Sequence, residues 1–278
     1  MTIDATYMTI DGLETFVRTA GSRGAPVVLL VHGGGMGTSS TVWHYVMPEL
    51  AKTHFVIASD APGFGFSGIP QGPLDVGVIA AHLIKLLDKL GVERTSLVGH
   101  SMGGQIAMRI TAEHPERVNR LALVAIGGRS LGLTYDSPGM ALMDRLAIDP
   151  DPAMIRELVE TLNARRDHVI EEEVKERTET AKRPGVLEAQ RKLRAARVNE
   201  KEGQAERAKV LINKLRASGV PIMLLWGSQE RLNPVDLGER IAKVLDWAEF
   251  HLIEGAGHNI PNDKPEKANE LLVRFLNA

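Results

Sequence analysis

The chain has 278 residues, of which 44% are hydrophobic and 24% charged, and its 33 Lys and Arg against 35 Asp and Glu give a formal net charge of −2. This near-neutral balance supplies no electrostatic footprint for nucleic acid or an anionic membrane surface. The chain has no cysteine, which excludes a disulfide framework, a thiolate zinc site and a cysteine nucleophile. No apolar run is long enough for a membrane span and no leader pattern is visible, so we expect a cytoplasmic protein. The motifs described below add the expectation of a small-molecule substrate. A homodimer or a higher homo-oligomer stays open.

The predicted elements begin with a hairpin, because residues 7–10 and 14–19 flank Asp11-Gly12, a strong two-residue turn signal. Short apolar runs then recur along the chain and predict strands buried on both faces. These runs lie at residues 27–31, 55–58, 96–98, 121–126, 220–226 and 250–253. Helical periodicity occurs between them, at 78–90 and at 102–113. The fold class is therefore α/β, a mostly parallel sheet with helices on both faces.

The alternation breaks once, between residues 130 and 216, where apolar positions such as Ile155 and Leu162 recur at helical spacing within a highly charged stretch. A structureless loop of this length is improbable in a compact domain. We therefore predict a helical lid, or cap, over residues 130–216, inserted into a core domain of residues 1–129 and 217–278. A coiled coil or partner helix is the alternative, but sustained heptads are lacking. Three lid methionines are candidates for an apolar pocket or for ordinary core: Met140, Met143 and Met154.

The most specific motif is the G-x-S-x-G pentapeptide at residues 99–103, between a predicted strand and a predicted helix. At such a turn the backbone of Ser101 is strained, and the flanking glycines remove side chains that would collide, so the hydroxyl stands exposed above the sheet edge. The helix N-terminus beside it offers free N–H groups and a positive dipole end, which suits an oxyanion. The alternative is a Gly- and Ser-rich turn without chemistry. We predict that Ser101 is a nucleophile.

A second glycine-rich segment, HGGGMG at residues 32–37, follows the first buried strand. Its N–H groups could cradle a phosphate or hold an oxyanion. The phosphate patterns need G-x-G-x-x-G opening a helix or a terminal Gly-Lys-Ser/Thr, and neither is complete. Beside a serine turn the oxyanion interpretation is favoured, with the N–H groups of Gly34 and Met102 as donors. His32 is expected to brace the loop rather than to transfer protons.

A serine hydroxyl needs a base, and among nine histidines His258 follows the last predicted strand in a glycine-punctuated turn, at the sheet edge where the serine turn should lie. The base needs a carboxylate that fixes its tautomer. Glu230 follows the strand at 220–226 and gives the chain order serine, acid, histidine. The rival is Asp236, otherwise explained as an acid in the first turn of a helix. Asp60 is expected to stabilise a turn.

Together these segments resemble the α/β-hydrolase family over nearly the whole chain. The resemblance rests on the HGGG loop, the DAPGFGFSG turn at residues 60–68, the GHSMGG elbow, the WGSQE acid turn and the GAGH histidine turn, which occur in family order. Within the family the chain is similar to the meta-cleavage product hydrolases, serine enzymes that hydrolyse a carbon–carbon bond in 2-hydroxy-6-oxo-dienoates from aromatic degradation. It departs from them by having Glu230 in place of Asp, Asn259 in place of an aromatic residue, and His100 in place of Asn.

The resemblance implies a serine hydrolase with a Ser101, His258 and Glu230 triad, without metal or cofactor, in which ketonisation of the dienol precedes cleavage. It also implies that Arg177, in the lid, holds the substrate carboxylate. Further candidate substrate-binding residues are Gly33, Gly35, His100 and Trp43. A carboxylesterase or lactonase acting on a small hydrophobic ester is the alternative, because the same residues cleave esters. A ligand-binding relative without catalysis is the remote alternative.

Overall fold

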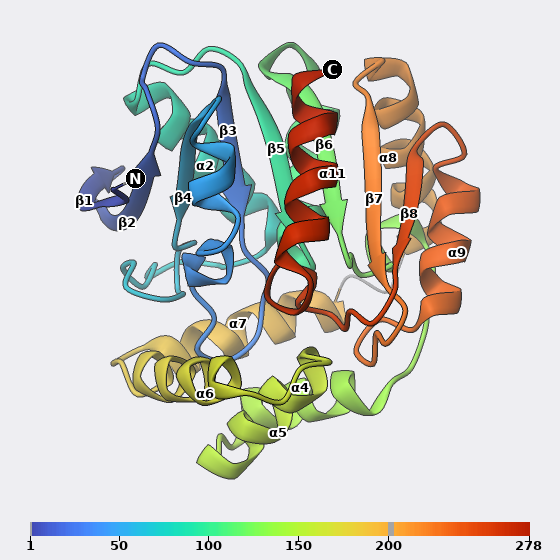
Figure 1. The fold of residues 1–278 in the computed structure, drawn as a ribbon. Helices are drawn as coiled ribbons and strands as arrows, with labels where there is room; N and C mark the ends of the chain where they lie inside the picture. The colour runs from blue at the N-terminus through green and yellow to red at the C-terminus, as the bar shows by residue number, and fades with distance from the viewer. Residues whose placement is uncertain (1, 200–202) are drawn as a thin grey trace.

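The computed structural model describes residues 2–199 and 203–278, and within these ranges it has an eight-stranded sheet in the order β1-β2-β4-β3-β5-β6-β7-β8 (Figure 1). The strands are β1 (Asp4–Ile10), β2 (Leu13–Ala20), β3 (Val27–Val31), β4 (Phe55–Ser59), β5 (Thr95–His100), β6 (Val118–Val124), β7 (Ile222–Gly227) and β8 (Glu249–Ile253). Strand β2 pairs antiparallel with β1 and β4, and all pairings among β3 to β8 are parallel. The predicted hairpin is confirmed, since Ile10 pairs with Leu13 across the turn.

Helices cover both faces of the sheet, as the continuous apolar strands predict (Figure 1). The covering helices are α1 (Met47–Leu50) and α11 (Pro265–Asn277) on one face, and α2 (Val76–Lys89), α3 (Met102–Glu113), α8 (Gln204–Ser218) and α9 (Val235–Val244) on the other. In β3, Val28 and Leu30 join the hydrophobic core under α1 and α11, whereas Leu29 and Val31 join the opposite core. Within the described residues, no helix is long and apolar enough to cross a membrane.

The lid lies beyond the carboxyl ends of the parallel strands (Figure 1). It contains α4 (Pro138–Ile148), α5 (Pro152–Leu162), α6 (His168–Ala181) and α7 (Val186–Asn199). These helices share a third hydrophobic cluster, in which Leu142 and Leu146 pack with Leu158 and Leu162. Four short helical segments complete the described structure: η1 (Ser40–Trp43), η2 (Pro115–Arg117), η3 (Arg129–Leu131) and α10 (Ile260–Asp263).

The predicted lid, residues 130–216, includes most of helix α8, but in the structure α8 packs on the core domain. Its Leu215 is fully buried in the core formed with α2 and α3, and Leu211 and Ile212 pack against the same core. The charged, weakly amphipathic sequence of α8 matches that of α6 and α7, which explains why periodicity did not separate them. We propose that the lid ends before α8 and that α8 belongs to the core domain.

Candidate active site

Ser101 occupies the strained turn that its motif predicts. It lies directly after β5 and caps α3 with φ 53° and ψ −117°, a conformation that costs an L-residue about 1–3 kcal/mol. The neighbouring glycines permit the turn, because a Cβ on Gly103 would lie 2.1 Å from the carbonyl oxygen of Val31, and one on Gly99 would lie 2.5 Å from that of Gly103. The turn thus holds a half-buried serine at the carboxyl edge of the sheet.

The glycine loop after β3 lies against this turn. A Cβ added to Gly33 would be 3.2 Å from Cβ of Ser101, and one added to Gly34 would be 3.3 Å from Sδ of Met102. The backbone N–H groups of Gly34 and Met102 donate to no residue that the structure describes. The two predicted oxyanion donors are therefore neighbours, and both are free to bind an oxygen beside Ser101.

Two buried polar side chains brace the loop. His32 donates from Nδ1 to the carbonyl oxygen of Gly33 (2.7 Å) and accepts at Nε2 from the N–H of Ala61 (2.8 Å). Burial lowers the pKa of His32, in agreement with a ring whose Nε2 accepts a hydrogen bond. The carboxylate of Asp60 accepts from the N–H of Phe66 (2.8 Å). The bracing role of His32 and the turn role of Asp60 are both confirmed.

The side chains of Glu230 and His258, from the turns that follow β7 and β8, are in contact. Oε2 of Glu230 lies 2.6 Å from Nδ1 of His258, and both side chains are buried. Oε1 of Glu230 accepts from the N–H groups of Leu232 (2.7 Å) and Asn233 (3.0 Å), which fix the carboxylate. A Cβ on Gly227 would lie 2.3 Å from carbonyl oxygens in the turn before His258, so the close approach of the two turns requires glycine there.

Asp236, the rival acid, is not brought to His258. It is exposed in the first turn of α9, where its carboxylate lies 3.8 Å from the guanidinium of Arg240. This is the position that a helix-stabilising acid takes. Of the two candidate acids, only Glu230 contacts the histidine.

Ser101 and His258 line one small space, which we call the proximal cavity, with a volume of about 10 Å³. Its lining also includes Gly33, Gly34, Thr38, His100 and Arg177. The rings of His100 and His258 lie 4.6 Å apart, and Nε2 of His100 donates to the carbonyl oxygen of His258 (3.0 Å). Burial, and then the neighbouring His258, hold the pKa of His100 well below its ordinary value. Within the described residues the hydroxyl of Ser101 makes no hydrogen bond.

Arg177, from lid helix α6, reaches the proximal cavity with its side chain almost fully buried. Its Nε contacts Oε1 of Glu173 at 2.8 Å, and its Nη1 donates to the hydroxyl of Thr38 (2.6 Å). Glu173 also accepts from the side-chain amides of Asn163 (3.0 Å) and Asn259 (3.1 Å). The arginine is thus positioned by a largely buried carboxylate on its own helix and by the glycine loop.

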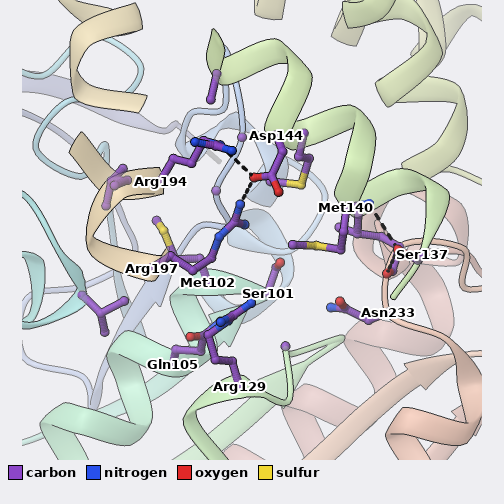
Figure 2. A pocket seen from close by; sticks show the side chains of 18 of the residues that line it. Ser101, Met102, Gln105, Arg129, Ser137, Met140, Asp144, Arg194, Arg197 and Asn233 are labelled. Carbon is purple, nitrogen blue, oxygen red and sulfur yellow. Dashed lines mark hydrogen bonds and ion pairs between the residues drawn. The ribbon is translucent and has the colours of Figure 1, made fainter. Parts of the chain in front are cut away.

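A much larger space, which we call the distal cavity, is lined by Ser101 and by residues of α4 and α7, with a volume of about 830 Å³ (Figure 2). Met140 and Met143 line it, and all three lid methionines, Met154 included, pack against the lid cluster. Its polar lining includes Gln105, Arg129, Asp144, Arg194 and Arg197. Gly34, Ser101, Met143 and Leu232 line both cavities. The serine therefore stands where the two spaces meet.

The predicted substrate-binding residues divide between these spaces. Gly33, His100 and Arg177 line the proximal cavity, and Gly35 lines the distal cavity. Trp43 lines neither of them. It is fully buried behind His100, with ring centroids 6.3 Å apart, so its contact is with that histidine.

Known proteins share this fold. Residues 26–265, which include every site residue above, match the family model described as alpha/beta hydrolase fold. The chain belongs to the α/β-hydrolase family. This hydrolase is 31% identical over 293 residues to a 2-hydroxy-6-oxononadienedioate/2-hydroxy-6-oxononatrienedioate hydrolase of a Pseudomonas species, covering 99% of this chain and 95% of the relative.

Two further relatives carry related names. The 2-hydroxy-6-oxo-6-phenylhexa-2,4-dienoate hydrolase of Comamonas testosteroni is 29% identical over 263 residues, covering 90% of this chain and 87% of the relative. The solved structure of the enzyme of that name from Rhodococcus sp. strain RHA1 matches with a TM-score of 0.89 and 26% identity, over 100% of this chain and 99% of that chain. The resemblance to the meta-cleavage product hydrolases is thus confirmed, and the protein is a hydrolytic enzyme of this family.

Sequence reasoning about the hydrolase missed Glu173 and the charged lining of the distal cavity. The signal for Glu173 was its spacing of four residues before Arg177 on a predicted helix. Arg129, Arg194 and Arg197 carried no such signal, because arginines are frequent in the lid sequence and next to it. In the part of the chain that the structure describes, no three His, Asp or Glu side chains are arranged to hold a metal ion.

Proposed function

We propose that this hydrolase cleaves a carbon–carbon bond in a 2-hydroxy-6-oxo-dienoate, with Ser101 as nucleophile, His258 as base and Glu230 as the group that orients the base. The observation that carries the proposal is the buried guanidinium of Arg177, which lines the same cavity as Ser101 and His258. A fixed cation beside the nucleophile suits a substrate carboxylate, whereas a neutral ester offers it no partner. The names of the relatives support the same substrate class.

The proposed attack begins at His258. Because its Nδ1 faces Glu230, its Nε2 is the nitrogen left to take the proton of Ser101. The deprotonated oxygen then adds to the keto carbon C6, and the negative charge on the carbonyl oxygen is held by the N–H groups of Gly34 and Met102. Each such donor contributes about 2.7–4 kcal/mol to lowering the barrier.

Cleavage of C5–C6 requires the dienol to ketonise first, because the electron pair of the breaking bond can then delocalise into the conjugated chain. Ketonisation moves the proton of the 2-hydroxyl to C5. When C5–C6 breaks, its electron pair delocalises to the C2 oxygen, which takes the proton held by His258, and C6 stays on Ser101 as an acyl ester. Water activated by His258 hydrolyses that ester. One water is consumed, and the products are a carboxylic acid and a 2-hydroxy-dienoate, whose carboxylate Arg177 would hold throughout.

The proposal requires the lid to move. The proximal cavity, at about 10 Å³, has room for about one water molecule. A dienoate carboxylate can reach Arg177 only if lid side chains such as Met143 and Leu158, which line this cavity, move outward. The hydrogen bonds from Arg177 to Thr38 and Glu173 would then be partly exchanged for bonds to the substrate.

An ester substrate is the second candidate, and one observation favours it. The distal cavity reaches Ser101 without any rearrangement and is far larger than the proximal cavity. A small ester could bind there entirely and use the same serine and oxyanion donors. In that case Arg177 would only hold the lid on the glycine loop.

The deciding experiment compares kcat/KM for a coloured 2-hydroxy-6-oxo-dienoate and for simple aryl esters, using wild type and Arg177→Ala. We expect a loss of about 10- to 100-fold with the dienoate, the cost of a hydrogen bond to a charged group, and little change with esters. Arg156→Gln, which alters an exposed arginine on α5, is the matched control and should behave as wild type. Esters preferred by wild type, with no arginine effect on either substrate, would replace the proposal by an esterase.

A further inference from the structure

The arginines that line the distal cavity carry more positive charge than the carboxylates in its lining pair with. Arg129, Arg194 and Arg197 all line it together with Ser101. Arg197 hydrogen-bonds to Asp144, and Nε of Arg194 lies 3.5 Å from the same carboxylate oxygen (Figure 2). Arg129 makes no side-chain hydrogen bond or ion pair with any residue in the described ranges. One carboxylate thus contacts two of the arginines, and no carboxylate among the described residues contacts the third.

The two other acids in the lining do not make up the difference. Asp75 caps α2 by accepting from the N–H of Val78 (2.8 Å), and Asp136 is exposed to solvent. The buried Nε of Arg194 has no hydrogen-bond partner among the described residues, despite its contact with Asp144. Burial lowers the pKa of Arg197, and the charge of nearby Arg129 lowers it further. A bound anion would give Nε of Arg194 a partner and would stabilise the charged form of Arg197.

We propose that the distal cavity binds a carboxylate at the end of the substrate remote from the dienoate, so that the preferred substrate is a dicarboxylate. Arg129 and Arg197 are its binding residues. This inference rests on the proposed function and extends it, because Arg177 and these arginines line two different cavities, and Ser101 lines both of them. The acyl half that forms the ester with Ser101 then carries the second carboxylate, and hydrolysis releases it as a dicarboxylic acid.

The size of the cavity agrees with this occupant. At about 830 Å³ it lies near the upper end of the roughly 300–1,000 Å³ of small-molecule pockets. The apolar side chains of Met140 and Met143 also line the cavity and suit a short hydrocarbon chain. A purely hydrophobic substituent would instead leave the arginine groups desolvated and unpaired.

The test uses two matched pairs of substrates. The first pair is two 2-hydroxy-6-oxo-dienoates whose C6 chains are equal in length and end in a carboxylate or in a methyl group. The second pair is the p-nitrophenyl monoester of adipic acid and p-nitrophenyl hexanoate, which place the same two kinds of acyl chain on Ser101 without carbon–carbon cleavage. We expect wild type to prefer the carboxylate member of both pairs.

Arg129→Gln should lower kcat/KM for the carboxylate members about 10- to 100-fold and leave the neutral members unchanged. Arg197→Gln should do the same, and Arg197→Lys should recover much of the loss because it keeps the charge. Arg129→Gln is the decisive variant, since Arg129 holds no described partner and its replacement should not disturb folding. Arg191→Gln, on the exposed side of α7, is the control. Equal losses for both members of a pair would overturn the inference.

The failures of the two proposals are distinguishable. If neither dienoate is cleaved but the adipate ester is preferred and depends on Arg129, carbon–carbon cleavage is wrong and the dicarboxylate inference stands. If both dienoates are cleaved with the same kcat/KM and depend on Arg177 alone, the function stands and the dicarboxylate inference is wrong.

Discussion

Oε2 of Glu230 lies 2.6 Å from Nδ1 of His258, and both side chains are buried. A carboxylate at this distance fixes the tautomer of the imidazole and stabilises the imidazolium that forms when the ring takes a proton. Two backbone N–H groups hold its other oxygen. Glutamate is longer than aspartate by one methylene, and the loop after β7 accommodates this length.

Glu230→Gln should therefore lower kcat by about 10⁴-fold, the loss typical of a triad acid replaced by its amide. The amide can present the wrong hydrogen-bonding group to Nδ1 and carries no charge. Asp236→Asn, at the exposed rival position, should leave kcat within about twofold of wild type, since surface changes of this kind have small effects. Steady-state kinetics on one substrate measure both, and the reverse ranking would move the acid to Asp236.

The close packing of the turn at residues 99–103 predicts that one added methyl group at Gly103 lowers both activity and stability. Gly103→Ala would place a Cβ 2.1 Å from the carbonyl oxygen of Val31, a distance that only a shift of α3 or β3 relieves. We expect the variant to lose Ser101 reactivity and several degrees of thermal stability. Gly24→Ala is the control, because its Cβ would meet no atom within 4 Å. A Gly103→Ala protein with wild-type kcat and Tm would show that the turn is not sterically constrained.

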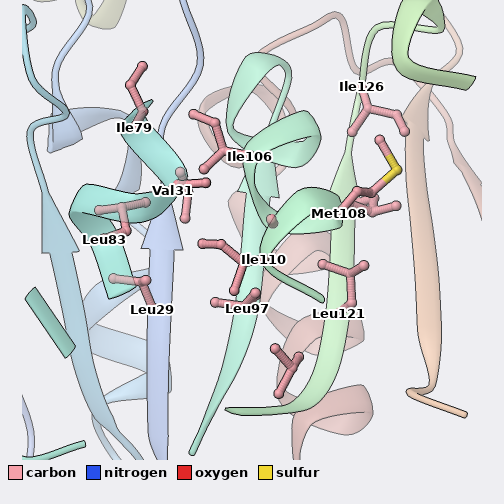
Figure 3. Close-up of a cluster of buried hydrophobic side chains, with 14 of the residues drawn as sticks. Leu29, Val31, Ile79, Leu83, Leu97, Ile106, Met108, Ile110, Leu121 and Ile126 are labelled. Carbon is pink, nitrogen blue, oxygen red and sulfur yellow. The ribbon is translucent and has the colours of Figure 1, made fainter. Parts of the chain in front are cut away.

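Most of the core was predictable because its signals are local. In β3, Leu29 and Val31 face α2 and α3, and Figure 3 shows them with Leu97 of the adjacent β5 against Ile106 and Ile110 of α3. Apolar runs of five residues and helical spacing encode this packing directly. The glycine punctuation around the serine and histidine encodes the turns in the same way.

The lid arginines were not predictable because their roles depend on tertiary position. Arg156 and Arg177 lie on neighbouring lid helices, yet the first is exposed and the second is almost fully buried in the proximal cavity. Helical spacing fixes neither which way α6 packs nor that a glycine loop lies beneath it. The same holds for Arg129 and Arg197, which are far apart in sequence and come together only when α7 covers the sheet edge.

Glu173→Gln should destabilise the protein, since it leaves the charge of Arg177 buried without its partner. The two side chains are 14% and 7% exposed, so we expect a loss of about 3–5 kcal/mol in the free energy of unfolding. Urea denaturation measures this loss. Glu171→Gln breaks an exposed pair with Arg156 and should change the midpoint little. Equal midpoints for the two variants would contradict the structural role of Glu173.

Acid should weaken the fold through its buried histidines. Burial lowers the pKa of His82 from 6.5 to about 4, so between these values the unfolded chain binds more protons than the folded one. The neutral His82 ring therefore makes its full contribution to the free energy of unfolding above about pH 6.5, and this contribution is lost as the pH falls towards 4. His82→Gln should make the unfolding free energy fall less steeply over this range. His44→Gln, at an exposed site, should keep the wild-type slope. If His82→Gln and wild type show the same dependence of the unfolding free energy on pH, His82 is not a source of the acid sensitivity.

Intact-mass analysis after treatment with a fluorophosphonate reagent tests the central claim, that Ser101 is an activated nucleophile. The account predicts one adduct, mapped to Ser101 by peptide sequencing, on wild type and none on a folded Ser101→Ala protein. Labelling should also slow strongly in Glu230→Gln, because the base is then less well oriented. A wild-type protein that stays unlabelled, or an adduct that persists in Ser101→Ala, would contradict the account.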